Sequence, residues 1–441
     1  MNSQQNINKT FISNTNNKYL PLIIVELYLL ISLLVLCFGP VQFKIHNPLL
    51  FSILFFFYHL FFIIGYVVGS KNLNHKKQKT RLFSKSYYYI LFTFGIIGIL
   101  ITYKNTMNNS SLIPYNFFYD LQRGIQEPAQ VYIDRMADVV YDGAGTSRSL
   151  NIFFIFIAFC KLLFIFYFIW FWKNLNFKLK IISIFYSILY ISPGIIAGVN
   201  SVLFWFILFT FTTLIIFYYL FNKKKLSFLF RGLAILFLIP ILSFGNIMSK
   251  RGGSFDYFIN SSTLGDITVK VNDIDTESSI IEDLNYSLVW MNFYVTQGYY
   301  GFSLTLDKEF KWTYGFGSSA FFQRQFNMLT GIDVGVDTYQ RRNDRIWGEY
   351  SMWHSFYGQV ANDFSPYGII LLMYVIGWYF AKIWLSVIMR NSFYGAAMMP
   401  IFAIMFIFFP ANNQVFGYID SISYFFIISL FWFFENYKIK L

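Results

Sequence analysis

The chain has 441 residues, of which 56% are apolar and only 13% are charged. With a mean hydropathy of +0.50, this composition excludes an ordinary soluble enzyme and indicates a protein that crosses a membrane many times. The formal net charge of +12 does not indicate a nucleic-acid partner, because the basic residues lie in short clusters between apolar runs.

Apolar runs predict an all-α, polytopic transmembrane helical bundle with about ten spans, since a helix needs roughly 20 apolar residues to cross a bilayer. The polar residues 1–19 precede the first run and no small-residue cleavage site follows it, so this run is expected to be an anchor. In chain order the runs cover residues 20–40, 48–69, 87–103, 150–172, 181–199, 202–221, 229–248, 366–387, 393–409 and 418–435.

Basic residues predict the orientation of these spans. Lys and Arg gather in alternate connections, and such residues remain in the cytoplasm, so both ends of the chain are expected there. The same alternation places 104–149 and 249–365 outside. The expected organisation is an N-terminal bundle at 1–248, a large external loop at 249–365 and C-terminal transmembrane helices at 366–441.

Two local patterns refine the large loop. Tyr286–Leu306 is apolar but interrupted by polar residues and glycines, which predicts a helix on the membrane surface or a re-entrant helix. Ser365 followed by Pro366 predicts a helix N-cap with proline at the first helical position.

Familiar catalytic and metal motifs are absent from the sequence. There is no phosphate-binding glycine loop with Lys, no zinc-binding His pair and no cluster of Cys and His, and Cys37 and Cys160 both lie inside apolar runs. Asp273 and Asp275 resemble a metal-binding Asp-x-Asp element, but a solvated acidic loop is the favoured interpretation. We therefore expect no metal and no soluble cofactor.

External cations suggest an anion site. Lys250 and Arg251, followed by two glycines, end the seventh run, where they could bind a phosphate at the membrane surface. Arg324, Arg341 and Arg345 lie further along the same loop, and several arginines that converge could hold a diphosphate without a metal. The alternative is that the external arginines form salt bridges, with nearby acids such as Asp134, Asp138, Asp344 and Glu349.

A polar and aromatic stretch at 341–363 is the densest candidate site, and a helix there would put Arg341, Arg345 and Glu349 on one face. His354 is a candidate general base near neutral pH, and Asp363 is a second candidate if the nearby bilayer raises its pKa. The alternatives are a histidine without a catalytic role and an aspartate that caps a turn. The candidate sugar contacts are Trp347, Glu349, Trp353 and Asn362.

Three ionisable residues lie within predicted spans, where an isolated charge is costly. Lys161 is close to the middle of its span, and Glu26 and His59 lie in the first two spans. A structural pair between Glu26 and Lys161 is expected. The alternative is a polar cavity for a lipid head group or a proton path.

Three stretches resemble the Wzy-type O-antigen and capsular polysaccharide polymerases: Tyr294–Gly301, Trp312–Ser318 and Trp353–Ser365. The layout of many spans with one large late external loop is also similar. The resemblance implies a GT-C-like glycosyltransferase of the bacterial inner membrane that acts on the periplasmic face. In that family, arginines of the external loops are thought to hold the diphosphate of the substrate, and Arg324 to Gly335 matches an Arg-x10-Gly pattern seen in some members.

The implied substrates, both donor and acceptor, are undecaprenyl-diphosphate-linked oligosaccharides held in membrane lipid. The implied partners are a chain-length regulator and a flippase of the same pathway. A diphosphate is a good leaving group, so cations to stabilise it and a base for the acceptor hydroxyl would suffice for an inverting transfer. Two alternatives stay open: an O-antigen ligase that uses lipid A core as acceptor, and a flippase or exporter without covalent chemistry.

Overall fold

The structure, a computed structural model, describes residues 17–71, 81–106, 112–141, 148–221, 267–269, 279–349 and 351–437. The helices of the N-terminal half are α1 (Leu20–Phe38), α2 (Pro48–Gly69), α3 (Lys85–Thr106), α4 (Phe117–Gln126), α5 (Pro128–Tyr141), α6 (Arg148–Ile157), α7 (Phe159–Trp170), α8 (Phe177–Ile196) and α9 (Ser201–Phe221). Those of the C-terminal half are α12 (Ser279–Ser303), α13 (Ala320–Thr330), α14 (Tyr339–Arg342), α15 (Phe356–Arg390), α16 (Phe393–Phe408) and α17 (Ile419–Asn436). The short strands β1 (Val41–Phe43) and β2 (Ile267–Val269) form one antiparallel pair.

Among the described residues, seven helical segments are long and apolar enough to cross a membrane. They are α1, α2, α3, Phe153–Trp170, α8, α9 and α15. The prediction of a helical membrane protein is thus confirmed. Of the other predicted spans, α16 is apolar but shorter, α17 carries acidic residues in its first and last turns, and the run at 229–248 lies outside the described residues.

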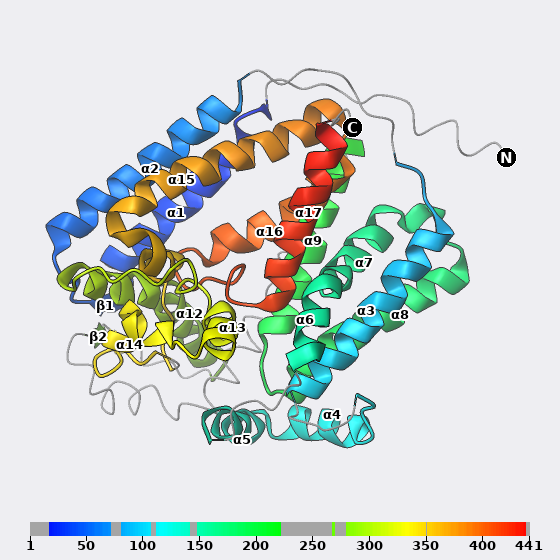
Figure 1. The fold of residues 1–441 in the computed structure, drawn as a ribbon, viewed down its shortest axis with the longest axis horizontal. Helices are drawn as coiled ribbons and strands as arrows, with labels where there is room; N and C mark the ends of the chain where they lie inside the picture. Colours follow the sequence, from blue (N-terminus) through cyan, green and yellow to red (C-terminus); the bar gives the residue numbers. More distant parts are fainter. Residues whose placement is uncertain are drawn as a thin grey trace.

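The helices are arranged so that the non-spanning elements gather at one end of the bundle. Figure 1 shows α12, α13, α14 and the strand pair together at this end, with α4 and α5 lying across it and the C-terminal end of α17 at the opposite end. At that opposite end, Trp384 Nε1 donates to Asn17 O at 3.2 Å, and the Tyr66 hydroxyl donates to Lys18 O at 2.8 Å. The described parts of the two segments predicted to be external therefore lie at one end of the molecule.

Helices α2 and α15 pack most closely. A Cβ atom added at Gly65 would overlap the carbonyl oxygen of Tyr374, and one added at Gly377 would overlap that of Phe62. Small residues permit such close approach, which is a main source of attraction between helices in lipid, where apolar burial alone gains little. The Tyr58 hydroxyl adds a hydrogen bond to Pro366 O at 2.6 Å.

Helix α15 contains a break at Ser365. This residue has φ 59 and ψ 163, and it separates a short N-terminal arm from the long membrane part. Pro366 has no N–H to continue the first arm, while Ser365 Oγ accepts a hydrogen bond from Gly368 N at 3.2 Å. The predicted N-cap is confirmed, but the helix begins earlier than expected, so Asn362 and Asp363 lie in the arm outside the predicted span.

Helix α12 covers the segment predicted to be interfacial or re-entrant. It is one continuous helix that packs against α1, α15 and β1, and it is not among the segments apolar enough to span. Its buried polar residues accept backbone N–H groups: Asn292 Oδ1 from Val41 at 3.1 Å, and Gln297 Oε1 from Trp353 at 3.1 Å. The interruptions in the sequence therefore mark contacts with other segments.

The contact between α2 and α15 gives a test. Gly377→Ala should lower the free energy of unfolding by about 1–3 kcal/mol, because the added methyl group meets backbone that cannot move away. Gly368→Ala, in the same helix, is the matched control, since its Cβ would make an ordinary contact with Phe364. Thermal unfolding of the two purified variants in detergent compares them, and equal unfolding temperatures would contradict close packing at Gly377.

Candidate functional site

Asp363 anchors the loop that precedes α13. Its carboxylate accepts hydrogen bonds from Thr313 Oγ1 at 2.5 Å, Gly317 N at 3.1 Å, Ser318 N at 2.8 Å and Ser318 Oγ at 2.5 Å. Hydrogen bonds to an ionised acceptor are stronger than those between neutral groups. Asp363 therefore accepts from a loop 45 to 50 positions earlier in the chain, which differs from the local cap or turn before Ser365 that was the alternative to a base.

Asn362, a predicted sugar contact, is buried and engaged by the protein itself. Its Oδ1 accepts from Tyr339 N at 2.8 Å, and its Nδ2 donates to Gly317 O at 3.0 Å and to Gln340 Oε1 at 2.7 Å. Gln340 Nε2 in turn donates to Gly358 O at 2.9 Å. This network joins α14 to the N-terminal arm of α15, and it gives Asn362 a structural role in the described arrangement.

The arginines predicted to bind the diphosphate differ in their contacts and exposure. Arg341 forms an ion pair with Glu349, whose pKa burial raises while the guanidinium opposes the shift. Helix α14 ends at Arg342, so the expected helical face does not form, and a turn returns Glu349 to Arg341 instead. Arg324 and Arg345 lie at the surface.

Arg123, in the first segment predicted to be external, follows the salt-bridge alternative. Arg123 Nη2 lies 2.5 Å from Asp134 Oδ2. The predictions for Lys250 and Arg251 lie outside the described residues, as does the Asp273–Asp275 element. Within the described part of the chain, no three His, Cys, Asp or Glu side chains are grouped as metal ligands.

His354 is enclosed by the protein. Its Nε2 lies 3.4 Å from Gly348 O, and its Nδ1 lies against the backbone of Gly301. Burial lowers its pKa to about 4, so the ring is neutral at pH 7. A neutral imidazole can accept a proton, but here a substrate could reach it only if the surrounding residues moved.

The two predicted tryptophan contacts differ in exposure. Trp347 is fully buried, its Nε1 donates to Trp353 O at 3.1 Å, and its ring meets Tyr300 edge-on at 4.8 Å. This placement leaves no ring face for a sugar. Trp353 is partly exposed and packs edge-on against Tyr294 at 4.5 Å.

A different aromatic pair lies on the surface. Trp312 and Tyr314 are each 58% exposed and their ring centroids are 5.0 Å apart. Thr313 between them is buried and bonded to Asp363, and Tyr314 lies in a turn with φ 58. The sequence places these two residues in one of the stretches that carry the family resemblance but gives neither a role of its own.

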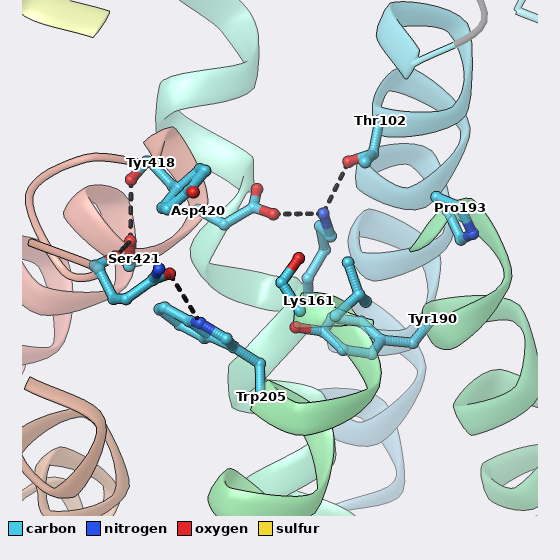
Figure 2. Close-up of a pocket in the computed structure, with 11 residues that line it drawn as sticks. Thr102, Lys161, Tyr190, Pro193, Trp205, Tyr418, Asp420 and Ser421 are labelled. Carbon is cyan, nitrogen blue, oxygen red and sulfur yellow. Dashed lines mark hydrogen bonds and ion pairs between the residues drawn. The ribbon is translucent and has the colours of Figure 1, made fainter. Parts of the chain in front are cut away.

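Lys161 has a partner that we did not predict. Its Nζ lies 2.5 Å from Asp420 Oδ2 and donates to Thr102 Oγ1 at 2.6 Å, as Figure 2 shows. The expected pair with Glu26 is wrong, because Glu26 Oε2 instead bonds to His59 Nδ1 at 2.8 Å. Sequence spacing could not reveal the Lys161–Asp420 pair, since its partners are 259 positions apart, whereas Glu26 and His59 lie in the consecutive helices α1 and α2.

The Lys161–Asp420 pair lines a cavity of about 110 Å³. Residues of α3, α7, α8, α9 and α17 and the loop before α17 surround it, with Tyr190 and Trp205 providing ring surfaces (Figure 2). Asp420 Oδ1 is buried and has no hydrogen-bond partner among the described residues. The predicted alternative of a polar cavity near Lys161 therefore has a structural counterpart.

The loop between α16 and α17 connects this cavity to the loop held by Asp363. Gln414, which lines the cavity, accepts from Trp205 Nε1 at 3.0 Å. The neighbouring Asn413 Nδ2 donates to Ser318 O at 3.1 Å, and Asn412 Oδ1 accepts from Gln359 Nε2 at 3.1 Å. The cavity thus lies at the same end of the bundle as the non-spanning elements.

Comparisons with known proteins add no identification: no family model, no curated protein and no solved structure matches the chain.

The anchoring role of Asp363 can be tested by amide hydrogen exchange. Asp363→Asn should accelerate exchange across residues 313–318, because the new amide NH₂ faces N–H and O–H donors. Asp337→Asn is the control, since its carboxylate pairs with the exposed Lys311 and such pairs contribute little. Unchanged exchange at 313–318 would remove the anchoring role.

The burial of His354 predicts a pH dependence of stability. The unfolded chain binds the proton near pH 6.5 and the folded chain only near 4, so stability falls as the pH is lowered from 6.5 towards 4. The loss attributable to this group is about 3 kcal/mol. Thermal unfolding between pH 7.5 and 4 should show a smaller loss for His354→Asn than for the wild type, and an equal loss would contradict the assignment.

Proposed function

We propose that the chain is a GT-C-like membrane glycosyltransferase that polymerises undecaprenyl-diphosphate-linked oligosaccharide units into O-antigen or capsular polysaccharide on the periplasmic face of the inner membrane. The observation that carries the proposal is a non-spanning segment that displays aromatic and guanidinium groups beside a membrane bundle. Its loop at 312–318 is anchored by Asp363, and Trp312 and Tyr314 project from that loop. This combination suits a substrate that has both a sugar portion and a lipid diphosphate.

The chemistry divides between these groups. In the proposed reaction an acceptor hydroxyl attacks the anomeric carbon, the bond from that carbon to the diphosphate oxygen breaks, and the electron pair leaves with the diphosphate. The proton of the attacking hydroxyl passes to an oxygen of the departing diphosphate. Arg324 and Arg345, both at the surface, would stabilise this charge together with Lys250 and Arg251. Asp363 acts as a positioning residue in this scheme, because its oxygens already accept four hydrogen bonds.

Deletion of the gene in its own host tests the reaction. Surface polysaccharide is then resolved by size on a gel. Lipid A core, or the corresponding carrier, capped by a single repeat unit is the result expected for loss of a polymerase. Complete loss of the antigen with accumulation of the lipid-linked donor would overturn the proposal and indicate a ligase or a flippase. The membrane face on which the donor accumulates would distinguish these two.

Arginine variants test the diphosphate site in a complemented deletion strain. Arg251→Ala and Arg345→Ala should each reduce long-chain polymer at least tenfold while the protein remains inserted, because each removes a cation from the leaving group. Lys173→Ala is the control, as this exposed cation lies in a connection predicted to be cytoplasmic. Polymer of normal length and amount from either arginine variant would exclude that residue from the site.

A further inference from the structure

The cavity beside Lys161 has an unusual combination of charge and hydrogen-bonding capacity. Lys161 is 3% exposed and its ammonium group is matched by Asp420, so the pair has no net charge. The Thr102 hydroxyl accepts a further Lys161 proton. Only one carboxylate oxygen of Asp420 is used, and Oδ1 remains an acceptor without a partner among the described residues.

This arrangement selects against charged ligands. A phosphate or carboxylate would approach Asp420 Oδ1 with like charge, and the Lys161 ammonium group is already engaged by two partners. A metal ion or an ammonium ligand would approach the same ammonium group at close range. In the low-dielectric interior of a bundle both encounters are costly. A neutral ligand that donates hydrogen bonds avoids both penalties.

The rest of the lining fits a ring that is polar at its edge and apolar on its faces. Trp205 and Tyr190 provide ring surfaces, and Pro193 and Val202 add apolar contacts. Ser201 and Ser421 also line the cavity, although the Ser421 hydroxyl is directed to Gln414 O and Tyr418 O. A pyranose presents the same two kinds of surface, with hydroxyl groups around its edge and C–H groups on its faces.

The position of the cavity agrees with a role in substrate binding. Thr102 is near the end of α3, and Ser201 and Asp420 are in the first turns of α9 and α17, so the cavity lies near the helix ends. Through Gln414 and Asn413 it adjoins the loop held by Asp363. A sugar bound there would lie next to the segment that carries the exposed Trp312 and Tyr314.

We propose that the cavity between Lys161, Asp420 and Trp205 binds one neutral sugar ring, with a ring hydroxyl donating to the Asp420 carboxylate, whose side chain is 27% exposed. The source of that sugar, an oligosaccharide repeat unit, rests on the proposed function. The binding itself does not require the transfer reaction, so the two can be tested separately.

The test is isothermal titration of the full-length protein in lipid nanodiscs. The probe is the free oligosaccharide repeat unit released from the host's own surface polysaccharide, without lipid or diphosphate. Wild type should bind it. The double variant Lys161→Met with Asp420→Asn should bind at least tenfold more weakly, as should Trp205→Phe. The double variant removes both charges together, which avoids leaving one buried charge without a partner.

Controls separate loss of binding from loss of folding. Thermal unfolding should show that the double variant is folded at the titration temperature, and Tyr87→Phe, at the opposite end of α3, should bind like wild type. Equal affinity of wild type and the folded double variant would overturn the proposal, as would the absence of binding to wild type, which would leave a cavity occupied by water. If binding is abolished by the variants but the gene deletion does not indicate a polymerase, the sugar site stands and the proposed function fails.

Discussion

Helices α2 and α15 approach until backbone meets backbone, because Gly65 and Gly377 carry no side chain at the crossing. The remaining architecture depends on this contact. It fixes the membrane part of α15, and the break at Ser365 then directs the N-terminal arm toward the loop at 312–318. Since Asn362 and Asp363 lie in that arm, the arm in turn holds the loop at 312–318 and α14.

The fold could be predicted from sequence wherever one physical term dominates. Apolar length alone identifies α1, α2 and α8 as spans, since the cost of exposing backbone to lipid leaves no other structure for such runs. The Ser365 cap was predictable for a similar reason, because proline restricts its neighbours in a fixed way. The ion-pair partner of Lys161 could not be predicted, because Lys161 and Asp420 are 259 positions apart in the chain.

The candidate site also shows that sequence alone does not identify the partners of a side chain. Trp347, Asn362 and His354 have the side chains that a sugar site needs, but the same side chains also satisfy buried backbone and pack against one another. The amino-acid composition cannot distinguish a sugar contact from a structural contact, because the two roles differ in how far the side chain is buried in the fold. The exposure of Trp312 and Tyr314 has the same limit, since it depends on a turn in which Tyr314 has φ 58 and on the bond from Thr313 to the distant Asp363.

The Lys161–Asp420 pair also bears on how the protein is made. Lys161 enters the membrane early in synthesis, whereas Asp420 belongs to α17, which is synthesised much later. A lysine within an apolar span is costly to insert unless a partner neutralises its charge. Until α17 has been synthesised, the charge of Lys161 is therefore not neutralised by Asp420. Chains cut short before Asp420 would lack this partner permanently, and the charge of Lys161 would stay without its acidic counterpart.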